Sequence, residues 1–445
     1  MHIVIVGGGE VGFALAQALC PSHDVFVIDH APDTAARFEP LDVQFVLGSG
    51  TSSETLARAG AARAAVLVAC TGLDEVNLVA CAMARRVARP QTICFVSRED
   101  FLAADDQGLA AFGVDRVIWP EAQLATDIER IIRIPDALDA ESFADGAIRL
   151  IEYRIDAASA VANRRIADLH LPHGTLVVAV RRGDALFIPS GTSELRSGDK
   201  AVMMGTPEAL NEIRRRFRKD AAAHRQRVTI IGGGDVGFHL AQRLDQGGAL
   251  DLTIIERDAQ RGEMIAGQLT RALVLEGDGT DLELLESEDI GRSDVLVSVI
   301  DNDERNLLAS LLGRQLGVRR VLTRVSRRSN LRLFERVGVD VAISARGAAI
   351  DSVLHQIQGG ATRLLAVVEQ GAGRILELDV PPGYTSRALR DLAAPLNSIV
   401  GAIIRDSKPI IPRGNDRIEP GDRLIVFTTY AAADRVRDYF TKTDA

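Results

Sequence analysis

Short β-branched runs alternate along this chain with segments whose apolar residues recur at helical spacing. Residues 3–6 (IVIV) and 228–231 (VTII) consist entirely of β-branched residues, and such runs are typical of central parallel strands buried on both faces. After the first run, "FALAQALC" from Phe13 has apolar residues at helical intervals. Strands that alternate with helices in this way predict an α/β fold with parallel sheets.

The pattern occurs twice. "GGGEVG" from Gly7 returns as "GGGDVG" from Gly232, 225 positions later (232 − 7). An offset of 229 relates "GSGT" to "GDGT" (277 − 48) and "DEVNL" to "DERNL" (303 − 74). The offset returns to 225 for "FGVD" and "VGVD" (340 − 115). Because a shared offset extends over more than a hundred residues, each half is predicted to contain a whole domain of this type.

A smaller unit with a different pattern follows each of these domains. "FIPSGTSELRSGDKAVMMG" pairs with "IIPRGNDRIEPGDRLIVFT" at an offset of 223 (414 − 191), and the paired stretches lead to "ALNEIRRRF" and "AADRVRDYF". Alternating apolar residues and Gly-Asp turns predict short strands, closed by one helix. We therefore expect four domains at residues 1–135, 136–221, 226–358 and 359–445, with a charged linker at "RKDAAAHRQR" (218–227).

The glycines after each apolar run follow the G-x-G-x-x-G spacing of dinucleotide-binding folds. In the first copy these are Gly7, Gly9 and Gly12. The first glycine permits the tight turn, the second lets backbone approach a pyrophosphate, and the third lets helix and strand pack closely. The helix N-terminus then supplies amide donors for the phosphates. The alternative, a fold of this type that binds nothing, remains open at either copy.

An acidic residue ends the next predicted strand in both halves. "VFVI" leads to Asp29, 20 residues after Gly9 (29 − 9), and "LTII" leads to Glu256. A carboxylate in this place accepts hydrogen bonds from ribose hydroxyls and repels a 2′-phosphate, which favours NAD or adenine nucleotides over NADP.

Polar residues also follow the fourth predicted strand of each domain. Thr71-Gly72 come after "VLVAC", and Ile300-Asp301 come after "VLVSV"; open α/β sheets bind ligands at such strand ends. Asp74 and Asn77, with their counterparts Asp303 and Asn306, either contact a ligand or cap the following helix, and we favour capping for these pairs.

Composition narrows the function classes. The 445 residues suffice for several domains, and the net charge of −9 gives no overall attraction to nucleic acid or anionic lipid. The four cysteines have no CxxC spacing and are expected to be reduced thiols. Because no apolar stretch approaches about 20 residues, we expect a cytoplasmic protein whose membrane role is peripheral.

Catalytic signals are weak. The eight histidines do not recur between the copies: His239 follows the second glycine loop, but Ala14 occupies its place in the first. "HLPH" (His170, His173) is better interpreted as a turn than as half of a zinc site. The sequence therefore favours ligand binding without turnover, with an NAD-dependent oxidoreductase as the alternative.

Together, "IVIVGGGEVG", "VIDH", "GSGT", "TGLDEVNLVA" and the small domains resemble the KTN/RCK family of regulators of potassium conductance. The resemblance implies two Rossmann-like doubly wound domains, each followed by a small α+β RCK C-terminal domain, and NAD(H) and ATP/ADP as ligands. It also implies a homo-oligomer, four chains giving a ring of eight Rossmann domains, that gates an integral-membrane potassium channel or transporter of the TrkH/TrkG type. A regulator of another ion transporter is a further alternative.

The family's ligand positions carry over residue by residue. In the first half the implied site comprises Gly7, Gly8, Gly9, Glu10, Val11, Asp29, Thr51, Thr71 and Gly72. In the second half it comprises Gly232, Gly233, Gly234, Asp235, Val236, Glu256, Asp278, Gly279, Ile300, Asp301 and Arg324. No catalytic or metal-binding residue is implied.

The two implied sites differ at the strand position where the family commonly has an arginine that meets the phosphates. Arg324 fits this pattern, but Phe95 stands in the first half, with Arg98 three residues on. Ser49 likewise replaces the acid found at Asp278. We expect the second site to hold phosphates better, with Arg324→Ala abolishing binding and Phe95→Ala neutral. The helices of "NLVACAMARRVA" and "NLLASLLGRQLG" either form oligomer contacts or pack on their own sheets.

Overall fold

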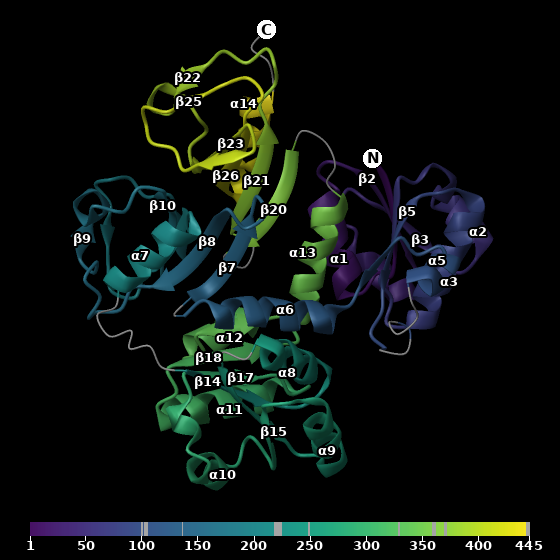
Figure 1. Ribbon diagram of the computed structural model, residues 1–445. Coiled ribbons are helices and arrows are strands. Elements are labelled where there is room, and N and C mark those ends of the chain that lie inside the picture. Colours follow the sequence, from purple (N-terminus) through teal and green to yellow (C-terminus); the bar gives the residue numbers. More distant parts are fainter. Residues whose placement is uncertain are drawn as a thin grey trace.

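The computed structural model describes residues 1–98, 101, 106–135, 137–217, 225–247, 250–327, 330–357, 362–368 and 372–441. Four compact units surround two central helices, α6 and α13 (Figure 1). Most of the expected linker, residues 218–224, lies outside the described residues. Among the helices that are described, none is long and apolar enough to cross a membrane.

The first unit is a six-stranded parallel sheet in the order β3-β2-β1-β4-β5-β6. Its strands are β1 (His2–Val6), β2 (Asp24–Asp29), β3 (Gln44–Leu47), β4 (Val66–Ala69), β5 (Gln91–Phe95) and β6 (Arg116–Ile118). Its helices are α1 (Glu10–Leu19), α2 (Ser53–Arg58), α3 (Asp74–Val87) and α5 (Asp106–Ala111), and α6 (Pro120–Arg133) follows the last strand. This is the Rossmann order, whose switch point lies between β1 and β4.

The third unit repeats this sheet in the order β16-β15-β14-β17-β18-β19. Its strands are β14 (Gln226–Ile231), β15 (Leu250–Glu256), β16 (Leu273–Glu276), β17 (Val295–Ser298), β18 (Arg320–Arg324) and β19 (Val341–Ile343). Its helices are α8 (Asp235–Gly247), α9 (Ala259–Gln268), α10 (Leu282–Ser287), α11 (Asp303–Leu316) and α12 (Leu331–Arg336), followed by α13 (Ala345–Ile357). The prediction of two Rossmann-like parallel sheets is confirmed.

Each small unit is a five-stranded antiparallel sheet beside a two-stranded ribbon. The first contains β7 (Ala137–Phe143), β8 (Ile148–Arg154), β10 (Thr175–Arg182), β11 (Ala185–Phe187) and β13 (Lys200–Gly205), the ribbon β9 (Arg164–Arg165) with β12 (Glu194–Leu195), and α7 (Pro207–Phe217). The second contains β20 (Thr362–Val368), β21 (Gly373–Asp379), β23 (Ser398–Arg405), β24 (Lys408–Ile410) and β26 (Arg423–Thr429), the ribbon β22 (Arg387–Ala388) with β25 (Arg417–Ile418), and α14 (Ala433–Thr441). The predicted closing helices are thus present.

The two small sheets pack face to face in one core. Phe143, Val202 and Met204 of the first belong to the same buried cluster as Ile375 and Phe427 of the second. The other face of each sheet packs in a second core, to which α7 contributes in the first unit and α14 in the second; the core that contains α14 is continuous with that of the first Rossmann domain. The shared core fixes the two small domains against each other.

The Gly-Asp turns, which the sequence indicated only as strand boundaries, place a buried aspartate against a partly exposed arginine in each small domain. Asp199, 1% exposed, accepts hydrogen bonds from Arg182 Nε at 2.9 Å and from Arg182 Nη2 at 2.8 Å. Asp422, 2% exposed, accepts two hydrogen bonds of 2.8 Å from Arg405. Arginine binds a carboxylate in this two-pronged manner with defined geometry, so these pairs fix the turn against the strand.

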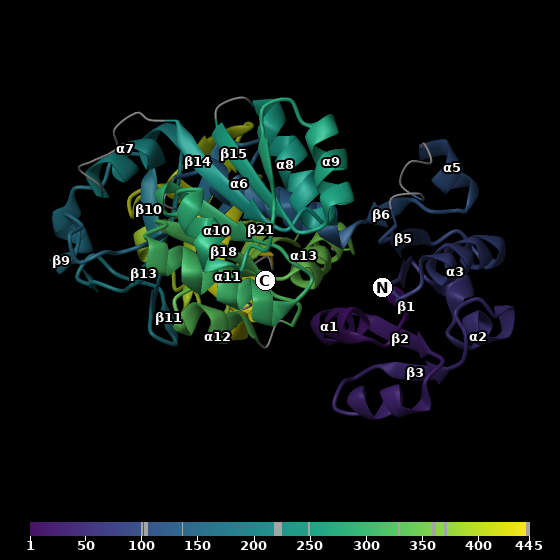
Figure 2. The same cartoon turned by 90° about the horizontal axis from the view of Figure 1, so that it is seen from below.

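The helices α6 and α13 are exchanged between the halves. After β6, α6 leaves the first sheet, and its Leu124, Ile128 and Ile132 enter the core of the second Rossmann domain. In return, Ile350 and Val353 of α13 enter the core of the first Rossmann domain. Figure 2 shows the first Rossmann domain at one side of the molecule, with α13 adjacent. The contact between the halves is therefore part of both cores.

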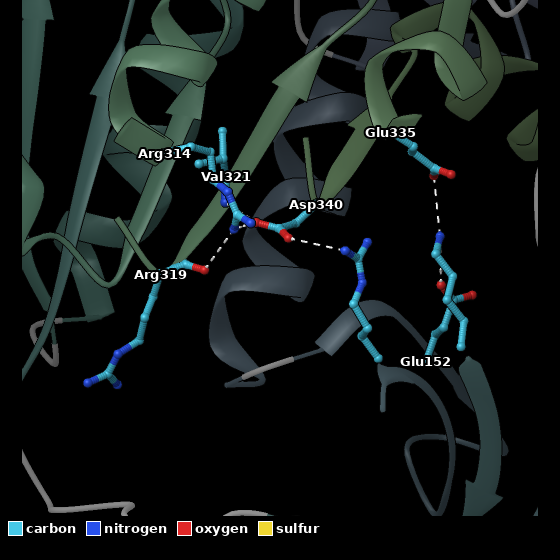
Figure 3. Close-up of polar contacts among 8 residues, drawn as sticks. Glu152, Arg314, Arg319, Val321, Glu335 and Asp340 are labelled. Carbon is cyan, nitrogen blue, oxygen red and sulfur yellow. Dashed lines mark hydrogen bonds and ion pairs between the residues drawn. The ribbon is translucent and has the colours of Figure 1, made fainter. Parts of the chain in front are cut away.

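Charged contacts fasten the first small domain to the second Rossmann domain (Figure 3). Lys200 lies between Glu152 at 3.3 Å and Glu335 at 3.4 Å. Asp340 accepts from Arg314 at 2.9 Å and lies 3.9 Å from Arg154. Buried Arg320 of β18 donates to the carbonyl oxygen of Ala137 at 2.7 Å, close to the end of α6.

Candidate nucleotide-binding sites

Both glycine loops lie at the carboxyl ends of the first strands, at the switch points of their sheets. Gly7 and Gly232 have φ values of +113° and +100°, a left-handed conformation that favours glycine. A Cβ on Gly12 would lie 1.8 Å from Gly7 O, and one on Gly237 would lie 1.9 Å from Gly232 O. These glycines therefore let loop and helix pack together, as the spacing predicted.

Gly9 and Gly234 face open space. A Cβ at either position would meet nothing within 4 Å. Both precede a helix, α1 or α8, whose first backbone amides are available to an anion. The loops thus combine an open approach to the backbone with a helix N-terminus, which is the geometry that phosphate binding requires.

The acids at the ends of β2 and β15 hold the glycine loops in place. Asp29 accepts from Gly8 N at 2.6 Å and from Ala31 N at 2.8 Å. Glu256 accepts from Gly233 N at 2.6 Å and from Asp258 N at 2.8 Å. Their predicted contact with a ribose stays a prediction, but each carboxylate lies at the loop where that contact would form.

Val11 and Val236 turn toward the protein interior rather than the loops. The Val236 side chain is buried in the core of its domain, and Val11 packs against the core of the first. Only their backbone amides can therefore serve a ligand. Gly279 has a packing role as well, since a Cβ there would lie 2.1 Å from Ile231 Cγ2.

The two Gly-x-Gly turns carry different polar groups. Asp278 accepts from Thr280 Oγ1 and from Arg305, both at 2.7 Å. Burial raises the pKa of Asp278, but the hydrogen bonds from Thr280 and Arg305 outweigh it and lower the pKa to about 2. In the first half, Ser49 and Thr51 share a hydroxyl hydrogen bond of 2.8 Å. The charged network is thus specific to the second site.

The turns after β4 and β17 are fastened by buried asparagines. Asn77 accepts from Thr71 N at 2.8 Å and donates to Phe95 O at 3.0 Å. Asn306 accepts from Ile300 N at 2.8 Å and donates to Arg324 O at 3.1 Å. Both asparagines tie the turn to the end of the neighbouring strand.

Helix capping by these pairs, favoured from the sequence, is wrong. Leu73 is the N-cap of α3 and makes no side-chain cap, while Asn302 caps α11 by accepting from Arg305 N at 2.8 Å. Asp74 and Asp303 instead accept from the backbone amides of Ser97 and Ser326. These side chains therefore bind backbone amides that follow the neighbouring strand, a tertiary contact that local sequence spacing does not reveal.

Arg324 and Phe95 occupy matching strand ends, as the repeat predicted. Arg324 is 17% exposed and pairs with Asp301 at 2.8 Å. Phe95 is buried in the core of the first domain. Arg98 does not take the place of the missing arginine in this structure, because it donates to Glu75 at 2.6 Å.

Three charged groups near the loops escaped the sequence interpretation. Arg261 of α9 donates to Gly233 O at 3.0 Å and lies 3.4 Å from Asp235. Arg346 of α13 pairs with Glu10, at the start of α1. Glu121 of α6 has a buried Oε2 without a hydrogen-bond partner, and burial raises its pKa although Arg324 lowers it. Arg346 comes from the second half of the chain to the first loop, and Glu121 comes from the first half to the second loop.

No group of three or more His, Cys, Asp or Glu side chains suited to a metal ion occurs among the described residues. His170 Nδ1 lies 3.0 Å from Asp168 O within the turn before β10. The four cysteines are free, and burial raises the pKa of Cys70 to about 12.

Two known domain families each match this chain twice, in the order of the domains described above. The TrkA-N domain family matches residues 3–120 and 228–345, and the TrkA-C domain family matches residues 150–218 and 375–441. The chain belongs to the TrkA family. It is 38% identical to the Trk system potassium uptake protein TrkA homolog 1 of Methanosarcina mazei, over 99% of this chain and 100% of that protein.

A bacterial relative and a solved structure extend the comparison. The Trk system potassium uptake protein TrkA of Haemophilus influenzae is 29% identical over 96% of this chain and 95% of its own. The GsuK channel bound to NAD is similar in fold, with a TM-score of 0.60 and 20% identity, over 99% of this chain and 78% of that one.

Proposed function

We propose that this TrkA-family chain is a nucleotide-binding regulatory subunit of a potassium uptake system. In this proposal it binds NAD(H) or ATP/ADP at two sites and controls an integral-membrane potassium transporter of the TrkH/TrkG type from the cytoplasmic side of the membrane. The names of its relatives support the potassium-uptake role. The observation that carries ligand binding is the pair of open glycine loops, each fastened by an acid at the next strand end.

The proposed ligand contacts are those that the family resemblance implies. Phosphates meet the backbone amides at Gly7 to Val11 and at Gly232 to Val236, and ribose hydroxyls meet Asp29 and Glu256. The turns Thr71-Gly72 and Ile300-Asp301, with Thr51, Asp278 and Arg324, complete the two sites. A 2′-phosphate would be repelled by the two acids, so NADPH is expected to be excluded.

Regulation follows from the exchange of α6 and α13. A ligand shifts a conformational equilibrium only if it binds the two states with different affinity. Because each Rossmann core contains a helix from the other half, a ligand that changes one loop also acts on the contact between the halves. We propose domain limits at 1–135, 136–221, 226–358 and 359–445. With these limits α6 belongs to the first domain and α13 to the third, so the contact made by the exchanged helices lies between domains.

We propose a homotetramer, which would supply eight Rossmann domains to a ring. The helices α3 and α11 pack on their own sheets through Cys81, Ala84 and Ala309. Their outer faces still carry exposed apolar side chains: Val79 and Val87 on α3, and Leu308 and Leu311 on α11. Exposed apolar groups of this kind favour contact with a second chain.

The test is calorimetric titration of the purified chain with ATP, ADP, NADH and NADPH, with the mass measured by light scattering. We expect a tetramer that binds NADH or adenine nucleotides, excludes NADPH and consumes no NADH. Gly9→Asp and Gly234→Asp provide matched controls, because their side chains enter open space and should block one site each. A folded monomer without ligand would contradict the proposal, and NADH consumption would indicate an oxidoreductase.

A further inference from the structure

The acid that follows each glycine loop has an arginine partner, but the two arginines come from different places. Asp235, the first residue of α8, lies 3.4 Å from Arg261 of its own domain. Glu10, the first residue of α1, pairs with Arg346, the second residue of α13. The first loop therefore obtains its cation from the opposite half.

The first site also lacks the cation that the second site has at the strand end. Phe95 occupies the place of Arg324, and Arg98 donates to Glu75. A phosphate on the first loop would lie beside the Glu10 carboxylate, which repels it. Among the described residues, the guanidinium of Arg346 forms an ion pair with that carboxylate.

The position of Arg346 is fixed by a buried helix. Ala349, Ile350, Val353 and Leu354, on the same helix, lie in the core of the first Rossmann domain. The guanidinium itself remains about half exposed, with 52% of its side chain accessible. It is thus held at the loop while staying open to a ligand.

We propose that Arg346 is a phosphate-binding residue of the first site, supplied by the second half of the chain. This inference rests on the proposed function. On binding, the phosphates compete with Glu10 for the guanidinium, so a ligand with more phosphate charge gains more. The first site accordingly prefers ATP to ADP and ADP to AMP.

The second site receives the opposite charge from its exchanged helix. The residue that matches Arg346 is Glu121 (346 − 225 = 121), whose buried Oε2 has no hydrogen-bond partner and whose carboxyl feels the charges of Arg324, Asp235 and Asp301. An acid there opposes additional phosphate charge. The exchanged helix therefore contributes an arginine to the first site and a carboxyl group to the second.

The test uses Gly234→Asp, which leaves the first site as the only open one, with and without Arg346→Gln. Titration with adenosine, AMP, ADP and ATP should show a loss of affinity that grows with phosphate charge, about tenfold or more for ATP and none for adenosine. The matched control is Arg261→Gln in the same background, which should leave all four affinities unchanged. Equal affinities with and without Arg346 would overturn the inference.

Glu10→Gln separates direct phosphate binding from mere neutralisation of Glu10. If Arg346 binds phosphate, Arg346→Gln still weakens ATP in the Glu10→Gln background; if the loss disappears there, the inference is wrong. Thermal melting checks the fold of each variant, and Arg346→Lys should retain part of the affinity. Absence of nucleotide binding by the unaltered chain would instead reject the proposed function itself.

Discussion

At the end of β18 the second half presents Arg324, whereas the first half buries Phe95 at the end of β5. The loop acids differ in the same sense, since Asp235 is paired within its own domain and Glu10 is paired across the halves. The two copies of one fold thus share the backbone of the glycine loop, while the charges beside it differ. Backbone geometry is the shared property of the repeat, and side-chain charge is what distinguishes the two sites.

The small domains provide a contrast, because both contain the same pair of an arginine with a buried aspartate. Replacing Arg182 or Arg405 with Ala leaves the buried carboxylate of Asp199 or Asp422 without its arginine, which should cost about 3–5 kcal/mol in the unfolding free energy of the affected domain. Denaturant unfolding of each variant measures this loss. Asp434→Ala, at an exposed acid, is the control. A marked difference between the two variants would show that the small domains are held differently.

Because α6 and α13 are exchanged, a substitution in one half of the chain should destabilise the Rossmann domain of the other half. Ile128, in α6, is 1% exposed in the core of the second Rossmann domain, so Ile128→Ala should destabilise that domain by about 2–5 kcal/mol. Hydrogen exchange should become faster in β14, β17 and β18. Ile93→Ala, in the first sheet, should loosen the first domain instead. If Ile128→Ala affected only the first domain, the exchange would be contradicted.

The difference between the strand ends is tested by Arg324→Ala. Loss of one charge-assisted phosphate contact should weaken binding at the second site by about 1.5–3 kcal/mol, or one to two decades in affinity. Because Phe95 belongs to the core, Phe95→Ala would also destabilise the domain, and Phe95→Leu is the better control for binding. Titrations in the Gly9→Asp background isolate the second site for Arg324→Ala, and titrations in the Gly234→Asp background isolate the first site for Phe95→Leu. Equal losses in both variants would remove the predicted asymmetry.

The last expected effect concerns pH. Burial raises the pKa of Glu141 to about 8, against the opposing effect of Arg130, whereas the matching position of the second small domain is Ala366 (366 − 225 = 141). A carboxyl whose pKa is higher in the folded state binds more protons there, so stability is highest below its unfolded pKa and falls as pH rises toward 8.

Glu141→Gln should therefore flatten the dependence of the melting temperature on pH between about 4.5 and 8, by roughly 2–4 °C for each kcal/mol removed. Thermal melts at several pH values measure the change. Glu54→Gln, at an exposed position, should leave the dependence as it was. An unchanged slope in the Glu141 variant would show that Glu141 does not titrate in this range.

Most of the fold could be predicted because its determinants are local and repeated. β-branched runs, helical spacing and glycines at fixed intervals specify each Rossmann domain along a continuous stretch of chain. The candidate loop residues and the strand-end acids followed from the same pattern. The roles of Asn77 and Asp74 did not, because their partners, Phe95 and Ser97, come from the next strand.

What the sequence alone determined is the plan: two α/β domains, two small domains, two glycine loops and unequal strand ends at Phe95 and Arg324. Only the tertiary structure decided which half each connecting helix belongs to. Residues 120–133 are amphipathic and residues 345–357 are largely apolar in either assignment, and an apolar surface does not specify which sheet it will cover. The exchange brings Arg346 to Glu10 and Glu121 toward Arg324, pairs separated by more than 200 residues that no local pattern encodes.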